Sequence, residues 1–174
     1  MPETSDYRAI EHLRDGRQIE IRALRPDDEA AMLAAIGRTS PVSLQRRFFA
    51  VKRGFSPKEI DFFMKIDFRN HVALIALVEE DGRPAIVGGG RYVVVEPDRA
   101  EVAFIVIDGY QGQGIGARLM QHLASIARDA GLKELIAEVL PENTAMRKVF
   151  SKFGFQSAPK RDPQVIHLVM KINP

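Results

Sequence analysis

A glycine-rich segment near the middle of the chain has the residue types that suit phosphate binding. Gly112, Gly114 and Gly116 lie at the junction of an apolar segment at residues 101–107 and an amphipathic one at residues 114–130. If these segments form a strand and a helix, the N–H groups of the first helical turn lack intrahelical acceptors and attract anions. Glycine also lets a ligand approach the backbone, because it has no Cβ. The pattern predicts a phosphate-binding loop that comprises Gln111, Gly112, Gln113, Gly114, Ile115, Gly116 and Ala117.

The spacing of these glycines excludes two common phosphate-binding motifs. A Walker A loop requires Gly-Lys-Ser/Thr, which does not follow here. The dinucleotide fingerprint requires G-x-G-x-x-G after the first strand of a βαβ unit, whereas these three glycines are spaced two apart. A purely structural role, in which the glycines only form a tight turn, stays open on this pattern alone.

Several other kinds of chemistry lack the residues they need. The chain contains no cysteine, which excludes a disulfide scaffold, a thiolate metal site and a cysteine nucleophile. The four histidines are scattered, with no second histidine at i+3 or i+4, so we expect no metal site. Lys+Arg number 25 against Asp+Glu 23, and no basic run stands out, so we expect no nucleic-acid partner.

The composition indicates one soluble domain. A length of 174 residues, of which 45% are hydrophobic, is enough for a single core. No apolar run approaches the roughly 18 residues that a membrane span needs, and the polar N-terminus has no signal-peptide core. We therefore expect a cytoplasmic protein without a membrane partner.

The elements that position the loop follow from the hydrophobic periodicity. Strands are predicted at residues 18–24, 71–78, 85–95, 101–107, 135–140 and 165–172. Helices are predicted after Pro26, after Ser40, after the capping box that starts at Ser56, and at residues 114–130 and 143–153. Residues 101–107 are apolar on both faces, which is typical of a strand inside a covered sheet. The mixture predicts an α/β (α+β) domain with a mixed sheet, and loose segments at residues 1–10 and 156–163.

The chain resembles the GNAT family of N-acetyltransferases over most of its length. The segment Gln111-Gly112-Gln113-Gly114-Ile115-Gly116 matches the family pattern Q/R-x-x-G-x-G/A. Four further segments resemble parts of the family. They are residues 22–28 (the family's opening), 100–107 (its fourth strand), 140–143 (its fifth strand with the start of the next helix) and 153–155 (the end of that helix). The resemblance implies a single GNAT-type domain at residues 17–174, with an N-terminal extension at residues 1–16. It also implies a mostly antiparallel sheet flanked by helices, a splay between the fourth and fifth strands, and acetyl-CoA (coenzyme A) as acetyl donor.

A narrower set of residues is similar to the acetyltransferase domain of bacterial Pat-type protein lysine acetyltransferases. The set comprises Leu13-Arg14-Asp15-Gly16, residues 40–49, Ile66-Asp67, Glu101, Asp108-x-Tyr110-Gln111-Gly112 and Glu142-Asn143-x-x-Met146. This likeness implies that the acceptor amine is a protein lysine. It makes an AMP-forming acyl-CoA synthetase a candidate protein partner.

The family resemblance also implies roles for individual residues. Glu101 aligns with the glutamate that serves as general base, which is needed because an alkylammonium with a pKa near 10.4 must lose a proton before it can attack. The main chains of Ile105, Val106 and Ile107 would pair with the pantetheine, and the Ile105 N–H would bind the developing oxyanion. Asn143 would hydrogen-bond the pantetheine, cap the next helix, or do both.

The general acid and the acceptor stay open at the level of sequence. Phe150 occupies the position where many GNAT relatives have a tyrosine acid, so no tyrosine is assigned to that role. An acidic acceptor pocket would indicate a polyamine substrate, whereas a shallow open groove would indicate a protein. A small-molecule amine acetyltransferase and a non-catalytic acyl-CoA-binding regulator are the alternatives, and the chain is a monomer or a homodimer.

A cluster of aromatic residues lies where this fold shapes the acceptor site. We expect most of these side chains to be core, with some lining the amine channel or forming a docking patch. Arg46 and Arg47 beside them either are solvated or dock an acidic partner surface. The aromatic residues are Phe48, Phe49, Phe55, Phe62, Phe63 and Phe68.

Overall fold

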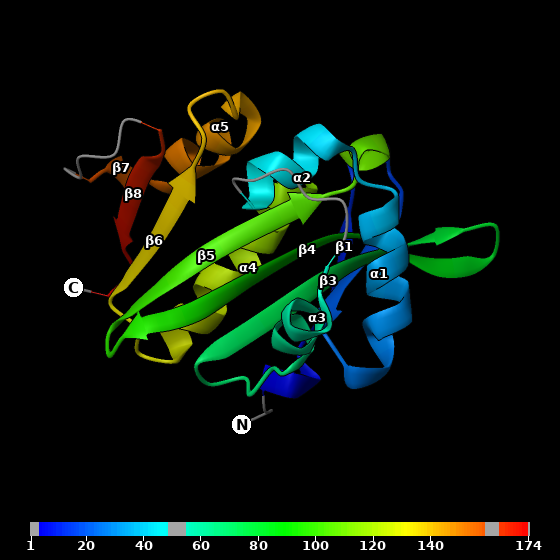
Figure 1. The fold of residues 1–174 in the computed structure, drawn as a ribbon, viewed down its shortest axis with the longest axis horizontal. Helices are drawn as coiled ribbons and strands as arrows, with labels where there is room; N and C mark the ends of the chain where they lie inside the picture. Colours follow the sequence, from blue (N-terminus) through cyan, green and yellow to red (C-terminus); the bar gives the residue numbers. More distant parts are fainter. Residues whose placement is uncertain (1–3, 49–54, 159–163, 174) are drawn as a thin grey trace.

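A sheet of eight strands organises the part of the chain that the computed structural model describes, residues 4–48, 55–158 and 164–173. The strand order is β1-β2-β3-β4-β5-β6-β8-β7, and every neighbouring pair is antiparallel except β5 and β6 (Figure 1). The strands are β1 (Arg8–His12), β2 (Gln18–Ala23), β3 (His71–Glu80), β4 (Arg83–Glu96), β5 (Arg99–Val106), β6 (Glu134–Val139), β7 (Gln156–Ser157) and β8 (Ile166–Lys171). The predicted mixed, mostly antiparallel sheet is confirmed.

Helices cover both faces of this sheet. On one face α4 packs against β3, β4 and β5, and on the other α1 lies over β4 and α2 over β5 (Figure 1). The helices are α1 (Glu29–Gly37), α2 (Pro41–Phe48), α3 (Pro57–Met64), α4 (Ile115–Asp129) and α5 (Thr144–Phe153), with short 3-10 turns η1 (Thr4–Asp6), η2 (Pro26–Asp28) and η3 (Asp108–Tyr110). No helix in the described ranges is both long and apolar enough to cross a membrane.

The close packing of α4 explains the glycine run in β4. A Cβ on Gly90 would lie 2.7 Å from the ring of Phe104 and 3.1 Å from a methyl group of Leu123. A Cβ on Gly88 would lie 3.2 Å from the Ile115 side chain. Because such distances are below ordinary van der Waals contact, these glycines let the apolar stripe of α4 approach the sheet.

The strands β5 and β6 separate along their length, as the GNAT resemblance implies for the family's fourth and fifth strands. Their parallel pairing runs from Arg99 with Glu134 to Val102 with Ala137 and stops there, although both strands continue. Figure 1 shows the two arrows diverging from this point toward α2 and α5. The second half of β5 therefore has backbone groups on its β6 side that the sheet does not pair.

Two short edge strands lie in segments that sequence patterning assigned to loose structure. Arg8–His12 forms β1, which pairs with β2 from Arg8 with Arg22 to His12 with Gln18, so the expectation of a loose segment is wrong for residues 8–10. β7 likewise pairs with β8 at the start of the predicted loose segment 156–163. Neither edge strand has an apolar alternation, because each is half-exposed or exposed and joins the sheet through main-chain hydrogen bonds.

Candidate active site

The glycine-rich loop presents its backbone to open space at the N-terminus of α4. Gly112 and Gly114 have φ values of +78° and +90°, and Gly114 is the N-cap of α4. Side chains with a Cβ disfavour this left-handed conformation, so the loop requires glycine at both positions. A Cβ at either position would meet no atom within 4 Å. The N–H groups of Ile115, Gly116 and Ala117 come first in α4 and lack intrahelical acceptors, so the loop has both the donors and the space for an anion.

Side-chain hydrogen bonds fix the inner side of the loop. The Gln111 side-chain amide donates to Val106 O at 2.9 Å and to Ser43 Oγ at 3.0 Å. Ser43 lies on α2, and Val106 is the last residue of β5. The loop is therefore attached at once to the separated end of β5 and to the helix above it.

Tyr110 and Gln113 attach the outer side of the loop to the rest of the sheet. The buried Tyr110 hydroxyl donates to Glu80 at 2.5 Å, and the Arg17 guanidinium lies 5.2 Å from the Tyr110 ring centroid. Arg17 also donates to the Gln113 side chain at 2.9 Å. Hydrogen bonds from Arg38 and then Tyr110 lower the pKa of Glu80 to about 2. The Tyr110 hydroxyl is thus committed to Glu80.

A groove of about 530 Å³ begins at this loop and is called the loop groove. It runs between the separated end of β5 and helix α5. Six basic or polar side chains from outside β5 and the loop line it, namely Arg14, Ser43, Arg47, Asn143, Lys148 and Lys152. The remaining wall is Phe104, Ile105, Val106, Tyr110, Gln111, Gly112, Gly114, Ile115, Gly116, Ala117, Ala145, Met146 and Val149.

A second groove of about 560 Å³, the strand groove, lies beside the paired part of β4 and β5. Its wall contains three cations, Arg47, Lys58 and Arg91, and two carboxylates, Glu59 and Glu101. The exposed side chains of Phe62 and Val95 stand at its rim. The other lining residues are Ser56, Phe63, Val93 and Ala103.

Glu101 lies where the two grooves approach each other. It pairs with Val93 in the β4–β5 ladder, is half-buried, and lines both the strand groove and a narrow pocket of about 50 Å³. Asn143, which also lines the loop groove, forms the other end of this pocket. Its side chain caps α5 by accepting from Met146 N at 3.4 Å. Arg47 lines both grooves and the narrow pocket, so the three spaces share one guanidinium side chain.

The hydrogen-bond alternation of β5 corrects one sequence-based assignment. The Ile107 N–H donates to Val87 O in β4 at 3.0 Å. Antiparallel ladders bond every second residue, and Ile105 pairs with Gly89, so the Ile105 N–H also points to β4. The prediction that Ile105 and Ile107 offer main-chain groups to a ligand in the splay is therefore wrong. The backbone groups that face β6 belong to Phe104 and Val106, and the hydrogen bond from Gln111 to Val106 O agrees with this parity.

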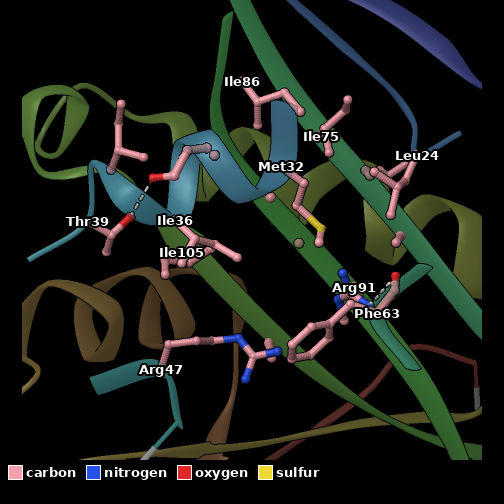
Figure 2. Close-up of a pocket in the computed structure, with 18 residues that line it drawn as sticks. Leu24, Met32, Ile36, Thr39, Arg47, Phe63, Ile75, Ile86, Arg91 and Ile105 are labelled. Atoms are coloured by element: carbon pink, nitrogen blue, oxygen red, sulfur yellow. Dashed lines mark hydrogen bonds between the residues drawn. The ribbon is translucent and has the colours of Figure 1, made fainter. Parts of the chain in front are cut away.

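A smaller, mainly apolar cavity of about 70 Å³ lies between α1 and the sheet (Figure 2). Met32, Ile36 and Ile75 form part of its apolar wall, and Arg47 and Arg91 line it as well as the strand groove. Sequence patterning did not single out Arg91. The signal was available, because Arg91 is the single charged residue in the otherwise mainly apolar segment between Pro84 and Val95.

The predicted aromatic cluster divides between core and groove. Phe63 is buried, Phe62 is exposed, and both line the strand groove. Phe55 and Phe68 pack against the core. Phe49 and the side chains of Arg46 and Phe48 lie outside the described residues.

Residues 40–155, which include α2, α3, β3–β6 and the glycine-rich loop, match the acetyltransferase (GNAT) family. The chain belongs to the GNAT family. As a member it is an N-acetyltransferase, and it takes its acetyl group from acetyl-CoA. The resemblance inferred from the loop motif and the neighbouring strands is thereby confirmed.

Comparison with individual relatives supports the narrower Pat-type resemblance. An acetyltransferase from Pseudomonas aeruginosa is 38% identical over 161 residues, which are 91% of this chain and 87% of that protein. Acetyltransferase Pat from Mycolicibacterium smegmatis is 31% identical over 82% of this chain, but the match spans only 42% of that longer protein. The crystal structure of the GNAT domain of S. lividans PAT superposes with a TM-score of 0.87 and 32% identity, over 94% of this chain and 96% of that one.

Proposed function

We propose that this GNAT enzyme transfers an acetyl group from acetyl-CoA to the side-chain amine of a protein lysine. The observation that carries the proposal is the position of Glu101, a carboxylate where the loop groove and the strand groove approach each other. In this proposal the loop groove holds the donor and the strand groove admits the acceptor. A base at that junction can reach the amine beside the reacting carbon.

The loop groove fits the donor in charge and in shape. The first-turn N–H groups of α4 and the positive end of the helix dipole suit the pyrophosphate of CoA. Phe104 and Val106 would pair with the pantetheine through their main chains, and Asn143 lines the same groove. Acetyl-CoA supplies a thioester, whose C–S bond breaks as the C–N bond to the acceptor forms.

Two groups of this chain would act on the reacting atoms. Glu101 would take the proton of the acceptor ammonium, either directly or through a water molecule, which generates the neutral nucleophile. The Phe104 N–H, aimed into the splay, would donate to the carbonyl oxygen as negative charge develops there. One such donor typically contributes about 3 kcal/mol to lowering the barrier.

No side chain is assigned as the acid for the departing thiol. Phe150 is buried between Phe104 and Phe155, and it offers no hydroxyl to the narrow pocket that it lines. The hydroxyl of Tyr110 donates to Glu80. A thiol with a pKa near 8.5 leaves readily as a thiolate without a protein acid.

The charge and openness of the strand groove favour a protein acceptor. Arg47, Lys58 and Arg91 outnumber Glu59 and Glu101, so the groove does not suit a polycationic polyamine. Its rim exposes apolar side chains, a composition that protein interfaces use. The Pat-named relatives agree with this choice, and an acyl-CoA synthetase is the first target to test.

Thiol release from acetyl-CoA tests the proposal against its alternatives. Wild type, Glu101→Gln and the exposed-surface control Glu79→Gln would be assayed with acyl-CoA synthetases and, separately, with polyamines, amino acids and amine drugs. We expect turnover on a synthetase that Glu101→Gln abolishes and Glu79→Gln preserves. Turnover on small amines alone would replace the protein acceptor with a small molecule. Tight CoA binding without turnover on any acceptor would indicate a non-catalytic regulator.

A further inference from the structure

Arg91 presents unused hydrogen-bond donors to the strand groove. Its Nη1 donates to Phe63 O at 3.1 Å and to His71 Nε2 at 2.9 Å, and its guanidinium lies 5.0 Å from the Phe63 ring centroid. Because a guanidinium can only donate, His71 Nε2 accepts this bond and the ring is neutral. Across the described ranges, no protein acceptor lies within hydrogen-bond distance of Nε or Nη2 of Arg91. One edge of this guanidinium is thus anchored, and the rest is available to a ligand.

A second cation stands next to Arg91. Arg47 comes from α2, and Figure 2 shows both guanidinium groups beside the Phe63 ring. Burial, and then the charge of Arg47, lowers the pKa of Arg91 to about 9, which still leaves it charged at neutral pH. Guanidinium groups bind carboxylates through paired, charge-assisted hydrogen bonds, so the Nε and Nη2 donors of Arg91 suit a carboxylate.

The other charges around the groove leave this spot positive. Glu59 accepts from the Ser56 N–H in the capping box of α3, at 3.1 Å. Glu101 acts on Arg47, since its carboxylate opposes the lowering of the Arg47 pKa that burial causes. Lys58 adds a further positive charge to the wall.

The register of β4 and β5 sets the distance between Arg91 and the proposed base. Arg91 pairs with Ala103, which is two residues along β5 from Glu101. Arg91 and Glu101 are therefore diagonal neighbours on one face, with Cα atoms about 7–8 Å apart. An acceptor that carries an amine and a carboxylate several bonds apart can reach Glu101 with the first and Arg91 with the second.

We propose that Arg91, with Arg47 beside it, forms a carboxylate-binding subsite for the acceptor. The inference rests on the proposed function, because it places the acceptor amine at Glu101. The carboxylate would come either from an acidic residue next to the target lysine or from a free amino acid. Arg91 then selects acidic acceptors over matched neutral ones.

Matched acceptor pairs test this subsite. One pair is a lysine peptide with a neighbouring Glu and the same peptide with Gln, and the other is free lysine and lysinamide. We expect wild type to prefer the acidic member of one pair at least tenfold in kcat/KM. Arg91→Gln should reduce the preference below about twofold, and Arg91→Lys should restore part of it. Arg83→Gln, an exposed change on the same strand, should leave the preference intact.

The outcomes separate failure of the subsite from failure of the proposed function. A preference in the peptide pair identifies an acidic neighbour of a protein lysine, and one in the lysine pair identifies a free amino acid. The subsite is overturned if wild type has equal kcat/KM for both members of each pair, or if Arg91→Gln loses kcat/KM equally on both members. Either result leaves the acetyltransferase proposal standing. If no acceptor is turned over, the proposed function fails. In that case calorimetry measures the Kd values of the acetylated acidic and neutral products. Equal Kd values overturn the subsite.

Discussion

The loop groove and the strand groove are built in different ways. The loop groove takes its donors mainly from the main chain of one continuous segment, the end of β5 and the turn into α4. The strand groove takes its chemistry from side chains on α2, α3, β4 and β5, which lie far apart in the sequence. A main-chain site tolerates variation in most side chains, whereas a side-chain site changes with every substitution. Members of a family can therefore share one acetyl donor while they differ in the amine that accepts the acetyl group.

The largest expected effect is a loss of catalytic rate without a loss of CoA binding. Glu101→Gln should lower kcat about 10²–10⁴-fold, which is the usual contribution of a positioned general base. The Kd for CoA, measured by calorimetry, should stay within about twofold of wild type, because Glu101 is not among the residues that line the loop groove. A parallel loss of CoA affinity would contradict the division between the two grooves.

The converse change should damage donor binding. Gly114→Val forces a β-branched residue into φ +90°, at a cost of roughly 1–2 kcal/mol, and places a side chain beside the first-turn N–H groups. We expect the Kd for CoA to rise at least 30-fold. Gly131→Val is the matched control, because Gly131 has φ +83° at the other end of α4 and lines neither groove. If both variants lose the same CoA affinity, the effect comes from helix stability and not from the loop.

The same division explains how much of the site the sequence could predict. The glycine motif, the strand before it and Asn143 were all assigned from sequence, because a continuous main-chain site leaves a continuous pattern. The parity of β5 was not predictable, since residues 101–107 are apolar on both faces and side chains do not reveal which N–H groups face β4. The sequence therefore did not distinguish Ile105, the donor expected from the resemblance, from Phe104, whose N–H faces β6.

Long-range pairing set the other limits of prediction. Most helices and strands were predicted within a few residues, because the buried ones repeat apolar residues at the helical or strand period. Edge strand β1 was missed, because its only strongly apolar residue, Ile10, is 40% exposed. Arg91 joined the site only once the β3–β4–β5 register and α3 brought His71 and Phe63 to it.

Acid should also lower the stability of the protein through His71, the partner of Arg91. Burial, and then the charge of Arg91, lowers the pKa of His71 from 6.5 to about 4. As pH falls below 6.5 the unfolded chain binds this proton before the folded protein does, so acid removes stability. Between pH 7 and pH 5 this residue should account for a loss of about 2 kcal/mol. Urea unfolding at both pH values should show a smaller loss in His71→Gln than in wild type, and equal losses would contradict the assignment.

The smallest expected effect concerns Asp108, which joins the two regions. Its carboxylate accepts from Ser40 N and Ser40 Oγ, each at 2.8 Å, and from Ser43 Oγ at 3.2 Å. It thereby ties the turn after β5 to the N-terminus of α2, the helix that carries Arg47. Asp108→Ala should cost about 1 kcal/mol of unfolding free energy, as loss of a helix cap does.

The kinetic effect of Asp108→Ala shows whether Asp108 couples the two grooves through α2 or only caps that helix. Because Ser43 also holds Gln111 of the loop, release of α2 should raise KM for acetyl-CoA and for the acceptor together, severalfold each. Asp98→Ala, which removes an exposed ion pair with Lys133 at 3.7 Å, should change neither KM. If Asp108→Ala lowers stability but leaves both KM values at their wild-type level, α2 and the loop hold their positions independently. The two grooves would then be separate sites on one strand, without a mechanical connection through α2.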